Sequence, residues 1–159
     1  MSEYHNPVLL GECIEALITN KSGIYADATF GGGGHSRGIL GALDSTGRLI
    51  AFDRDADAMA NTIDDSRFCL IRNNFRFIHN FVLLKGYTEG IDGIMADLGV
   101  SSHQFDTAER GFSFRYDAPL DMRMNTEAAV TAADLVNSLE EAELEKILRV
   151  YGEVGQSRK

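Results

Sequence analysis

The sequence has few cysteines and no long apolar run, and each absence excludes a class of protein. Cys13 and Cys69 form no Cys-x-x-Cys pair, which indicates buried reduced thiols rather than a disulfide framework or a zinc site. No apolar run reaches the roughly 20 residues that span a bilayer, so we expect no membrane contact. The first ten residues, MSEYHNPVLL, carry an early acid and lack the apolar core of a secretory signal. These absences predict a cytoplasmic protein.

Basic residues are also scarce, with 15 Lys and Arg against 24 Asp and Glu and a formal net charge of -9. This balance argues against a protein that holds nucleic acid through bulk electrostatics. Residues 66–88 differ, because they contain arginines, a lysine and interleaved phenylalanines but no acid. Such a mixture suits phosphate contacts and base stacking, and a strand and helix with outward arginines produce the same pattern.

Short apolar stretches alternate with helical patterns along most of the 159 residues, a length that fits about one domain. Strands are predicted at 23–30, 47–55, 67–73 and 91–100, and helices at 35–43 and 55–63 (with Asp55 as N-cap), while 75–84 is expected to be helical or nearly so. This alternation predicts an α/β fold, with a mainly parallel sheet and helices on both faces.

The pattern changes after Ser102, where residues 103–124 show no clean period and predict a long, ordered, functional loop. Two helices are expected next. Thr131 can cap the first, with Asp134 three residues on, and Ser138 with Glu141 forms a capping box for the second. The second helix carries one apolar stripe, formed by Leu144, Ile147, Leu148 and Tyr151.

Four consecutive glycines, residues 31–34, follow the first predicted strand. Glycine costs the most backbone entropy of any residue, so this position must need bare backbone. A strand, a glycine turn and a helix start form an anion or nucleotide site from free N–H groups and the helix dipole. Asp53 ends the next strand, about 20 residues after Gly33. A carboxylate at that position can accept hydrogen bonds from the hydroxyls of a ribose. A nucleoside crevice is therefore predicted; a glycine turn without ligand is the alternative.

The glycine pattern narrows the choice of nucleoside. The third position of a dinucleotide fingerprint falls on Ser36 or Arg37 rather than glycine, which speaks against a nicotinamide-dependent oxidoreductase. No Gly-Lys-Ser/Thr follows, so a P-loop is excluded. Asp27, just before the turn, can meet an ammonium group, and S-adenosylmethionine combines an ammonium with a ribose.

Six motifs occur in order: YHNPVLLGECIEAL, DATFGGGGHS, AFDRDADAM, DGIMADLGVSSHQFDTAERGFSF, PLDMRM and YGE. From about Tyr4 to Arg158 they resemble the bacterial methyltransferase family that modifies N4 of a cytidine in small-subunit ribosomal RNA (RsmH, or MraW). The resemblance implies a class I, Rossmann-like, S-adenosylmethionine-binding domain with an inserted helical domain. Residues 1–106 would supply strands one to four of the former, and residues 107–159 the beginning of the latter. It also implies the small ribosomal subunit as partner.

Carried over residue by residue, the resemblance implies the cofactor contacts. Gly33, Gly34 and His35 would line the methionine and ribose, Phe75 would lie beside the adenine, and Asp97 near the sulfonium. Core packing for Phe75, a helix-start role for His35 and an exposed loop position for Gln104 are the alternatives. An acid closing a buried strand, as Asp97 does, has no obvious structural reason. The expected cofactor-binding set is Asp27, Gly31, Gly33, Gly34, His35, Asp53, Phe75, Asp97 and Gln104.

In the implied reaction, a methyl group moves in line from sulfonium sulfur to cytosine N4, a poor nucleophile. Positioning can supply about 7 kcal/mol in good cases. The Asp97 carboxylate, or a carbonyl of DLGV, would hold an N4 hydrogen, and Ser101 and Ser102 would orient the base edge. The reaction needs neither a metal nor a covalent nucleophile. Four histidines are too scattered for a metal motif: His5, His35, His79 and His103.

The base must leave any stack to reach the sulfonium. In RGFSFRY, Phe112 and Phe114 can stack on RNA, and Arg110 and Arg115 can contact phosphates. Alternatively, the aromatics anchor this loop to the core. In PLDMRM, an acid and an arginine, Asp121 and Arg123, could simply form an internal ion pair.

Members of the family are about twice this length, so the resemblance implies a chain that stops inside the inserted domain. The fourth strand should lie beside the first, with the strands that normally flank it missing. An uncovered edge promotes association. A homodimer through this edge is therefore expected, and the alternative function is a non-catalytic fragment that binds cofactor and associates there.

Overall fold

The structure is a computed structural model that describes residues 7–156. The chain folds into two compact units, Met1–Gly99 and Val100–Lys159. Tyr4, His5 and Arg158, which belong to the predictions above, lie outside the described residues.

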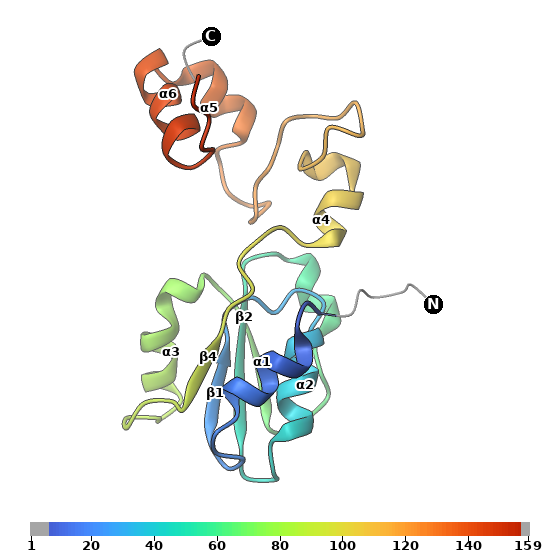
Figure 1. The fold of residues 1–159 in the computed structure, drawn as a ribbon, viewed down its shortest axis with the longest axis vertical. Coiled ribbons are helices and arrows are strands. Elements are labelled where there is room, and N and C mark those ends of the chain that lie inside the picture. The colour runs from blue at the N-terminus through green and yellow to red at the C-terminus, as the bar shows by residue number, and fades with distance from the viewer. Residues whose placement is uncertain (1–6, 157–159) are drawn as a thin grey trace. The chain divides into compact units, whose positions relative to one another are not determined.

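The first unit is built on a four-stranded, fully parallel sheet in the order β3-β2-β1-β4 (Figure 1). This confirms the predicted Rossmann-like arrangement, including the position of the fourth strand beside the first. Parallel strands bring their carboxyl ends to one edge, and that edge carries the candidate site. The strands are β1 (Ile24–Asp27), β2 (Arg48–Asp53), β3 (Phe68–Arg72) and β4 (Gly93–Met95).

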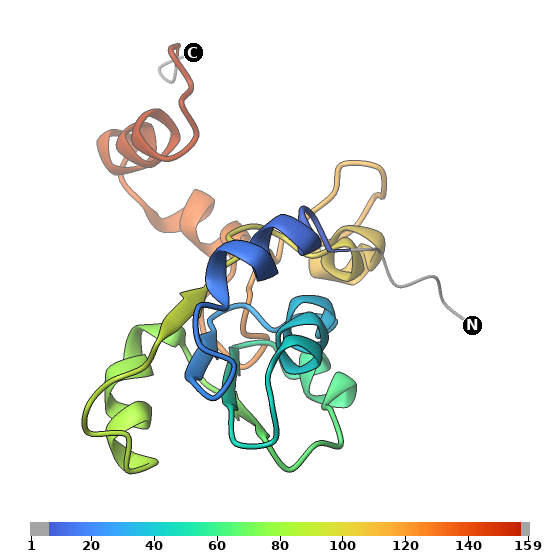
Figure 2. The same cartoon turned by 60° about the horizontal axis from the view of Figure 1, so that its bottom comes forward.

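Helices cover both faces of the sheet, as predicted (Figures 1 and 2). On one face lie α1 (Leu10–Leu17) and α2 (Gly34–Ala42), and on the other lies α3 (Ile78–Leu84). The alternation of β2 explains this, because successive side chains of a strand point to opposite faces. Leu49 packs with the α2 side chains, whereas Ile50 packs with Val82 of α3.

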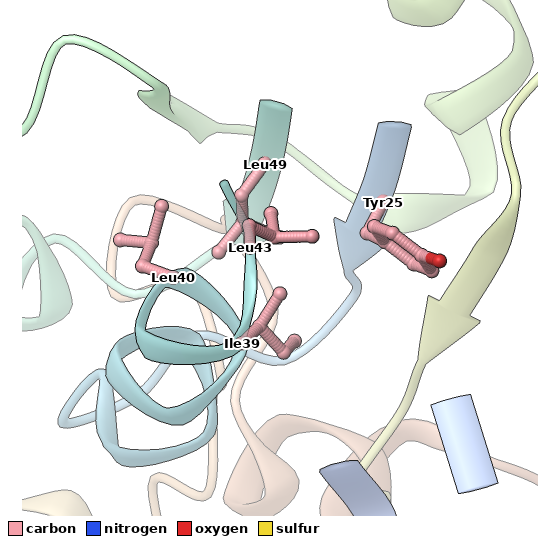
Figure 3. Close-up of a cluster of buried hydrophobic side chains, with 5 residues drawn as sticks. All are labelled: Tyr25, Ile39, Leu40, Leu43 and Leu49. Carbon is pink, nitrogen blue, oxygen red and sulfur yellow. The ribbon is translucent and has the colours of Figure 1, made fainter. Parts of the chain in front are cut away.

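The cluster with the most buried members lies between α2 and the sheet (Figure 3). Tyr25 of β1 and Leu49 of β2 pack there with Ile39 and Leu40 of α2 and with Leu43, the residue that follows this helix. Burying one such side chain contributes about 1.5–3 kcal/mol, so this cluster fixes α2, and the glycine turn before it, against the sheet.

One expectation in this unit was wrong in detail. The segment predicted as a helix at 55–63 is a short 3-10 helix, Asp57–Asn61, and its N-cap is Ala56 rather than Asp55. Instead, the Asp55 carboxylate accepts the Asp57 N–H, a local bond of the kind that competes with a regular helix. The segment 75–84 is helical throughout, as expected, with a 3-10 turn at Phe75–Phe77 followed by α3.

The second unit is helical, with α4 (Ser102–Asp106), a 3-10 helix (Ala108–Arg110), α5 (Ala132–Ser138) and α6 (Glu141–Val150). Residues 111–130 hold no helix or strand, as predicted for a long loop, but the loop begins later than expected because 102–110 is helical.

The caps of α5 and α6 differ from one another. Thr131 and Asp134 form the predicted capping box of α5. The predicted box of α6 was wrong, because α5 continues through Ser138 and Glu140 becomes the N-cap of α6, with no side-chain bond. None of the helices within residues 7–156 combines the length and apolarity needed to cross a membrane.

Candidate cofactor site

The glycine turn joins β1 to α2, and its four glycines have different reasons to be there. Gly31 and Gly33 have positive φ angles of 52° and 76°, which side-chain-bearing residues rarely adopt. A Cβ on Gly33 would approach the Phe30 ring to 2.8 Å, and one on Gly34 would clash with Pro7. Packing inside the chain therefore explains Gly33 and Gly34.

Gly31 is the position where the turn is open. A Cβ there would find no heavy atom nearer than the Thr29 carbonyl oxygen at 4.0 Å. The requirement for bare backbone at this residue thus comes from its φ angle, and the space beside it is open. The predicted cofactor contacts of Gly31 and Gly33 remain predictions.

Asp53 stands beside Gly31, as the nucleoside-crevice prediction requires. It ends β2, and its Oδ2 accepts the Gly31 N–H at 2.8 Å, while Oδ1 accepts the Asp55 N–H at 2.8 Å. Each carboxylate oxygen has two lone pairs, so each can accept one further hydrogen bond. Two fixed oxygens with spare lone pairs match the two hydroxyls of a ribose.

Asp27 is more deeply buried than is expected for a residue that contacts the ammonium group of a ligand. It is 1% exposed, and its oxygens accept the Thr29 N–H at 3.0 Å and the Ser36 hydroxyl at 2.6 Å. Burial raises the pKa of Asp27, although the Ser36 and Thr29 hydrogen bonds oppose this shift. These bonds join the end of β1 to the first turn of α2, and the ammonium contact stays a prediction.

His35 is buried at the start of α2, against the segment that precedes α1. Its Nε2 lies 3.1 Å from the Val8 carbonyl oxygen, which can only accept, so Nε2 donates. Together with Pro7 on Gly34, this contact places the segment against the helix start. The predicted cofactor contacts of Gly34 and His35 remain predictions.

Asp97 follows β4 and is exposed at the same edge of the sheet. Its N–H donates to the Thr29 hydroxyl at 2.8 Å, which connects the end of β4 to the glycine turn. Ile94 is 53% exposed, so β4 is not the buried strand on which the argument for Asp97 relied. Sequence reasoning missed Thr29, whose signal is a hydroxyl two residues after the acid that ends β1.

Phe75 is 42% exposed and belongs to none of the three buried clusters, so core packing does not explain it. It starts the turn after β3, where the Asn74 side chain caps the backbone by accepting the Arg76 N–H at 3.0 Å. An exposed ring on a fixed turn at the carboxyl edge suits stacking on a base. Further along the basic segment, Arg67 is paired with Asp65 at 2.6 Å.

In the second unit, the side chains of Ser101 and Gln104 each accept a hydrogen bond from the other residue's backbone N–H. Ser101 Oγ accepts the Gln104 N–H at 3.2 Å, and Gln104 Oε1 accepts the Ser101 N–H at 3.1 Å, which forms the capping box of α4. Gln104 is buried, so the exposed-loop alternative was wrong, whereas Ser102 is exposed. The predicted roles of these three residues in catalysis and cofactor binding stay predictions.

The four predicted RNA contacts differ in accessibility. Arg110 is 6% exposed and donates from Nη2 to the Arg123 carbonyl at 3.0 Å, with its guanidinium 6.0 Å from the Phe112 ring. Phe112 is half-buried, whereas Phe114 and Arg115 are exposed. The loop therefore presents Phe114 and Arg115 to solvent and keeps Arg110 within the unit.

The acid and arginine of PLDMRM form an ion pair, one of the two interpretations of that motif. Arg123 Nη2 lies 2.6 Å from Asp121 Oδ2, and Arg123 Nη1 donates to the Ala128 carbonyl at 2.6 Å. Hydrogen bonding to Arg123 lowers the pKa of Asp121. Within residues 7–156, no three His, Cys, Asp or Glu side chains converge in a way that would hold a metal.

Comparison with known proteins agrees with this architecture. The chain is 56% identical over 156 residues to ribosomal RNA small subunit methyltransferase H of Phocaeicola vulgatus, covering 98% of this chain and 51% of the relative. It is 54% identical to the protein of the same name from Bacteroides fragilis, with the same coverage. The chain thus spans about half the length of the curated relatives it matches.

A crystal structure of an rRNA-methylase from Clostridium thermocellum overlaps with 49% of each chain at 21% identity and a TM-score of 0.42, which is too little to support an argument. The family match is far broader, because the model described as MraW methylase family covers residues 2–159. The chain belongs to the MraW methylase family.

Proposed function

We propose that this chain is the cofactor-binding part of an S-adenosylmethionine-dependent methyltransferase that acts on N4 of a cytidine in small-subunit ribosomal RNA. One observation carries the proposal: the Asp53 carboxylate, fixed by the Gly31 N–H, stands beside the open position of the glycine turn. The family and the names of its relatives support the same conclusion.

The residues present fit an adenosyl cofactor. Asp53 would hold the ribose hydroxyls, the exposed Phe75 ring would lie along the adenine, and the start of α2 would face the methionine part. When bound, the cofactor supplies a methyl group activated by a sulfonium. Asp27 stabilises the glycine turn by accepting hydrogen bonds from the Thr29 N–H and the Ser36 hydroxyl on either side of it.

Asp97 is the residue of the first unit best placed to act on the amino group of a base. Its side chain is exposed at the carboxyl edge, and its backbone is held by Thr29. The carboxylate would accept a hydrogen bond from N4–H, which favours the pyramidal nitrogen of the transition state, and can take the proton afterwards. Ser102, exposed three residues beyond the glycine of DLGV, would contact the base edge.

RNA would be engaged mainly through Phe114 and Arg115. A fully exposed aromatic ring can stack on a splayed base, and the neighbouring guanidinium can contact phosphate. Phe112 and Arg110 would support this loop, since Arg110 is bonded within the unit. The partner would be a small ribosomal subunit in the cytoplasm, where the free thiols Cys13 and Cys69 remain reduced.

A second candidate function, non-catalytic association through β4, is favoured by one observation. β4 lies at the edge of the sheet in the described residues, and Ile94 and Leu98 are 53% and 73% exposed. Exposed strand edges with apolar side chains pair readily with another chain. Sedimentation of the 159-residue chain at several concentrations tests for a dimer, and a Leu98→Lys variant should abolish it.

The central experiment tests whether the 159-residue chain transfers a tritiated methyl group to small subunits from a strain that lacks the modification. Calorimetry measures cofactor binding by the same chain. A full-length relative serves as positive control. Asp53→Ala should weaken cofactor binding, and Asp97→Ala in the relative should mainly lower turnover. Labelled subunits support the proposal and show that this chain transfers the methyl group by itself. Cofactor binding without label, together with a dimer in sedimentation, would favour the non-catalytic alternative, and absence of cofactor binding would contradict the proposal.

A further inference from the structure

Gly31 is held on both sides by side chains that come from different elements. Its N–H donates to Asp53 Oδ2 at 2.8 Å, and its carbonyl accepts from Asn61 Nδ2 at 3.1 Å. Asn61 is the last residue of the 3-10 helix after β2. The two bonds fix the peptide groups before and after the Gly31 Cα, and with them the φ angle of 52°.

Arg37 of α2 completes a ring of hydrogen bonds around this turn. Its Nη1 donates to the Gly32 carbonyl at 2.6 Å, and its Nη2 donates to the Asn61 carbonyl at 3.2 Å. The turn, α2 and the 3-10 helix are thereby joined into one unit. Glycine has more backbone freedom than any other residue, so a glycine turn stays preorganised only if other groups restrict it.

We propose that Asn61, supported by Arg37, is a positioning residue that holds Gly31 so that Asp53 presents both oxygens to a ribose. This inference rests on the proposed function and extends it to two residues outside the motifs that suggested it. Asn61 acts through the Gly31 carbonyl, and Arg37 acts through the carbonyls of Asn61 and Gly32. Their effect reaches the ligand only through the carboxylate of Asp53.

The route through Asp53 gives a readout that a merely structural role would not produce. Adenosine and 2′,3′-dideoxyadenosine share the base but differ in the ribose hydroxyls. Loss of the Asn61 donor should weaken the binding of adenosine, whose ribose hydroxyls would contact Asp53, and should leave the binding of dideoxyadenosine unchanged. Losing one net hydrogen bond of about 0.5–1.5 kcal/mol corresponds to a roughly two- to tenfold loss of affinity.

The experiment titrates the 159-residue chain with each nucleoside by NMR. Asn61→Asp keeps the side-chain shape and removes the donor, Asn61→Ala controls for the added charge, and Asn80→Asp, on the exposed surface of α3, is the matched control. Amide hydrogen exchange at Gly31, measured without nucleoside, should be faster in both Asn61 variants and unchanged in Asn80→Asp.

The expected result is a two- to tenfold loss of adenosine affinity in both Asn61 variants, with dideoxyadenosine affinity within about twofold of the unmodified chain. An equal loss for both nucleosides, or no loss for either, would overturn the inference while leaving the proposed function in place. If the unmodified chain binds adenosine no more tightly than dideoxyadenosine, Asp53 does not bind the ribose hydroxyls. That result would contradict both the proposed role of Asp53 and this inference.

Discussion

The two units of the chain are stabilised in different ways. In the first unit, apolar side chains from both faces of the sheet are buried, including Tyr25, Ile39 and Phe52. In the second, the buried residues among those described are polar, Gln104 and Arg110, while α5 and α6 expose apolar side chains. The first unit relies on packing, and the second on caps, hydrogen bonds and ion pairing such as that between Asp121 and Arg123.

This difference bears on where a precise site can be built. Close-packed elements hold side chains in fixed positions, and Asp53, Thr29 and the glycine turn all sit at the edge of such a core. The exposed Phe114 and Arg115 stand on a loop whose bonds are mostly polar. The packed unit is therefore the better support for the proposed cofactor site, and the loop suits the adaptable contact that is proposed for RNA.

The largest expected effect comes from the packed core. Ile39→Ala removes a fully buried side chain of α2 and should lower the free energy of unfolding by about 2–5 kcal/mol. Ile147→Ala on α6, where the side chain is 39% exposed, should cost less than about 1 kcal/mol. Urea denaturation measures both. Equal costs would show that the two units are packed alike.

The next effect should be confined to the second unit. Arg123→Met removes the pair with Asp121 and the bond to the Ala128 carbonyl. Amide exchange should become faster across residues 108–134 and stay unchanged in β1 and β2. Arg149→Met, an exposed arginine of α6, is the control and should change neither region. Faster exchange in the sheet would contradict the separation of the units.

A smaller effect is expected at the connection between β4 and the glycine turn. Thr29→Val keeps the shape but leaves the Asp97 N–H without its acceptor, at a cost of about 1 kcal/mol. Exchange of the Asp97 amide should accelerate, and the exposed Thr88→Val should be neutral. An unchanged Asp97 amide would mean that Thr29 does not hold this residue.

The smallest effect concerns pH. Burial raises the pKa of Asp27 above its ordinary 3.8, so the folded protein binds this proton more tightly than the unfolded chain. That stabilisation is complete below pH 3.8 and is lost as pH rises through the raised value. Asp27→Asn has no such proton, so its stability should fall less than that of the unmodified chain between pH 4 and pH 8. Parallel urea curves at several pH values test this, and identical pH dependence would contradict it.

Much of the first unit could be predicted, because local patterns report local structure. Apolar alternation located the strands, and the spacing from Gly33 to Asp53 correctly placed a carboxylate beside the turn. Contacts between distant residues could not be predicted in this way. Nothing in the periodicity shows that Thr29 bonds Asp97, or that Asn61 bonds Gly31.

Two errors concern short polar side chains at expected helix starts. Asp55 bonds the backbone two residues on, and a 3-10 helix forms instead of the expected α-helix. Ser138 matched a capping pattern, but α5 extended through it. Gly34 has a packing reason that the motif does not show, because Pro7 lies against it, and its predicted cofactor contact stays a prediction. A motif thus locates a candidate cap or turn, but not the contacts that the folded chain makes there.

The most direct test is an NMR titration of the 159-residue chain with S-adenosylhomocysteine. The account predicts that amide shifts concentrate at residues 31–35, at Asp53 and at Phe75, and that Asp53→Ala abolishes them at the same ligand concentration. Shifts confined to α5 and α6, or none at saturating ligand, would contradict the claim that an adenosyl cofactor binds at the carboxyl edge of this sheet.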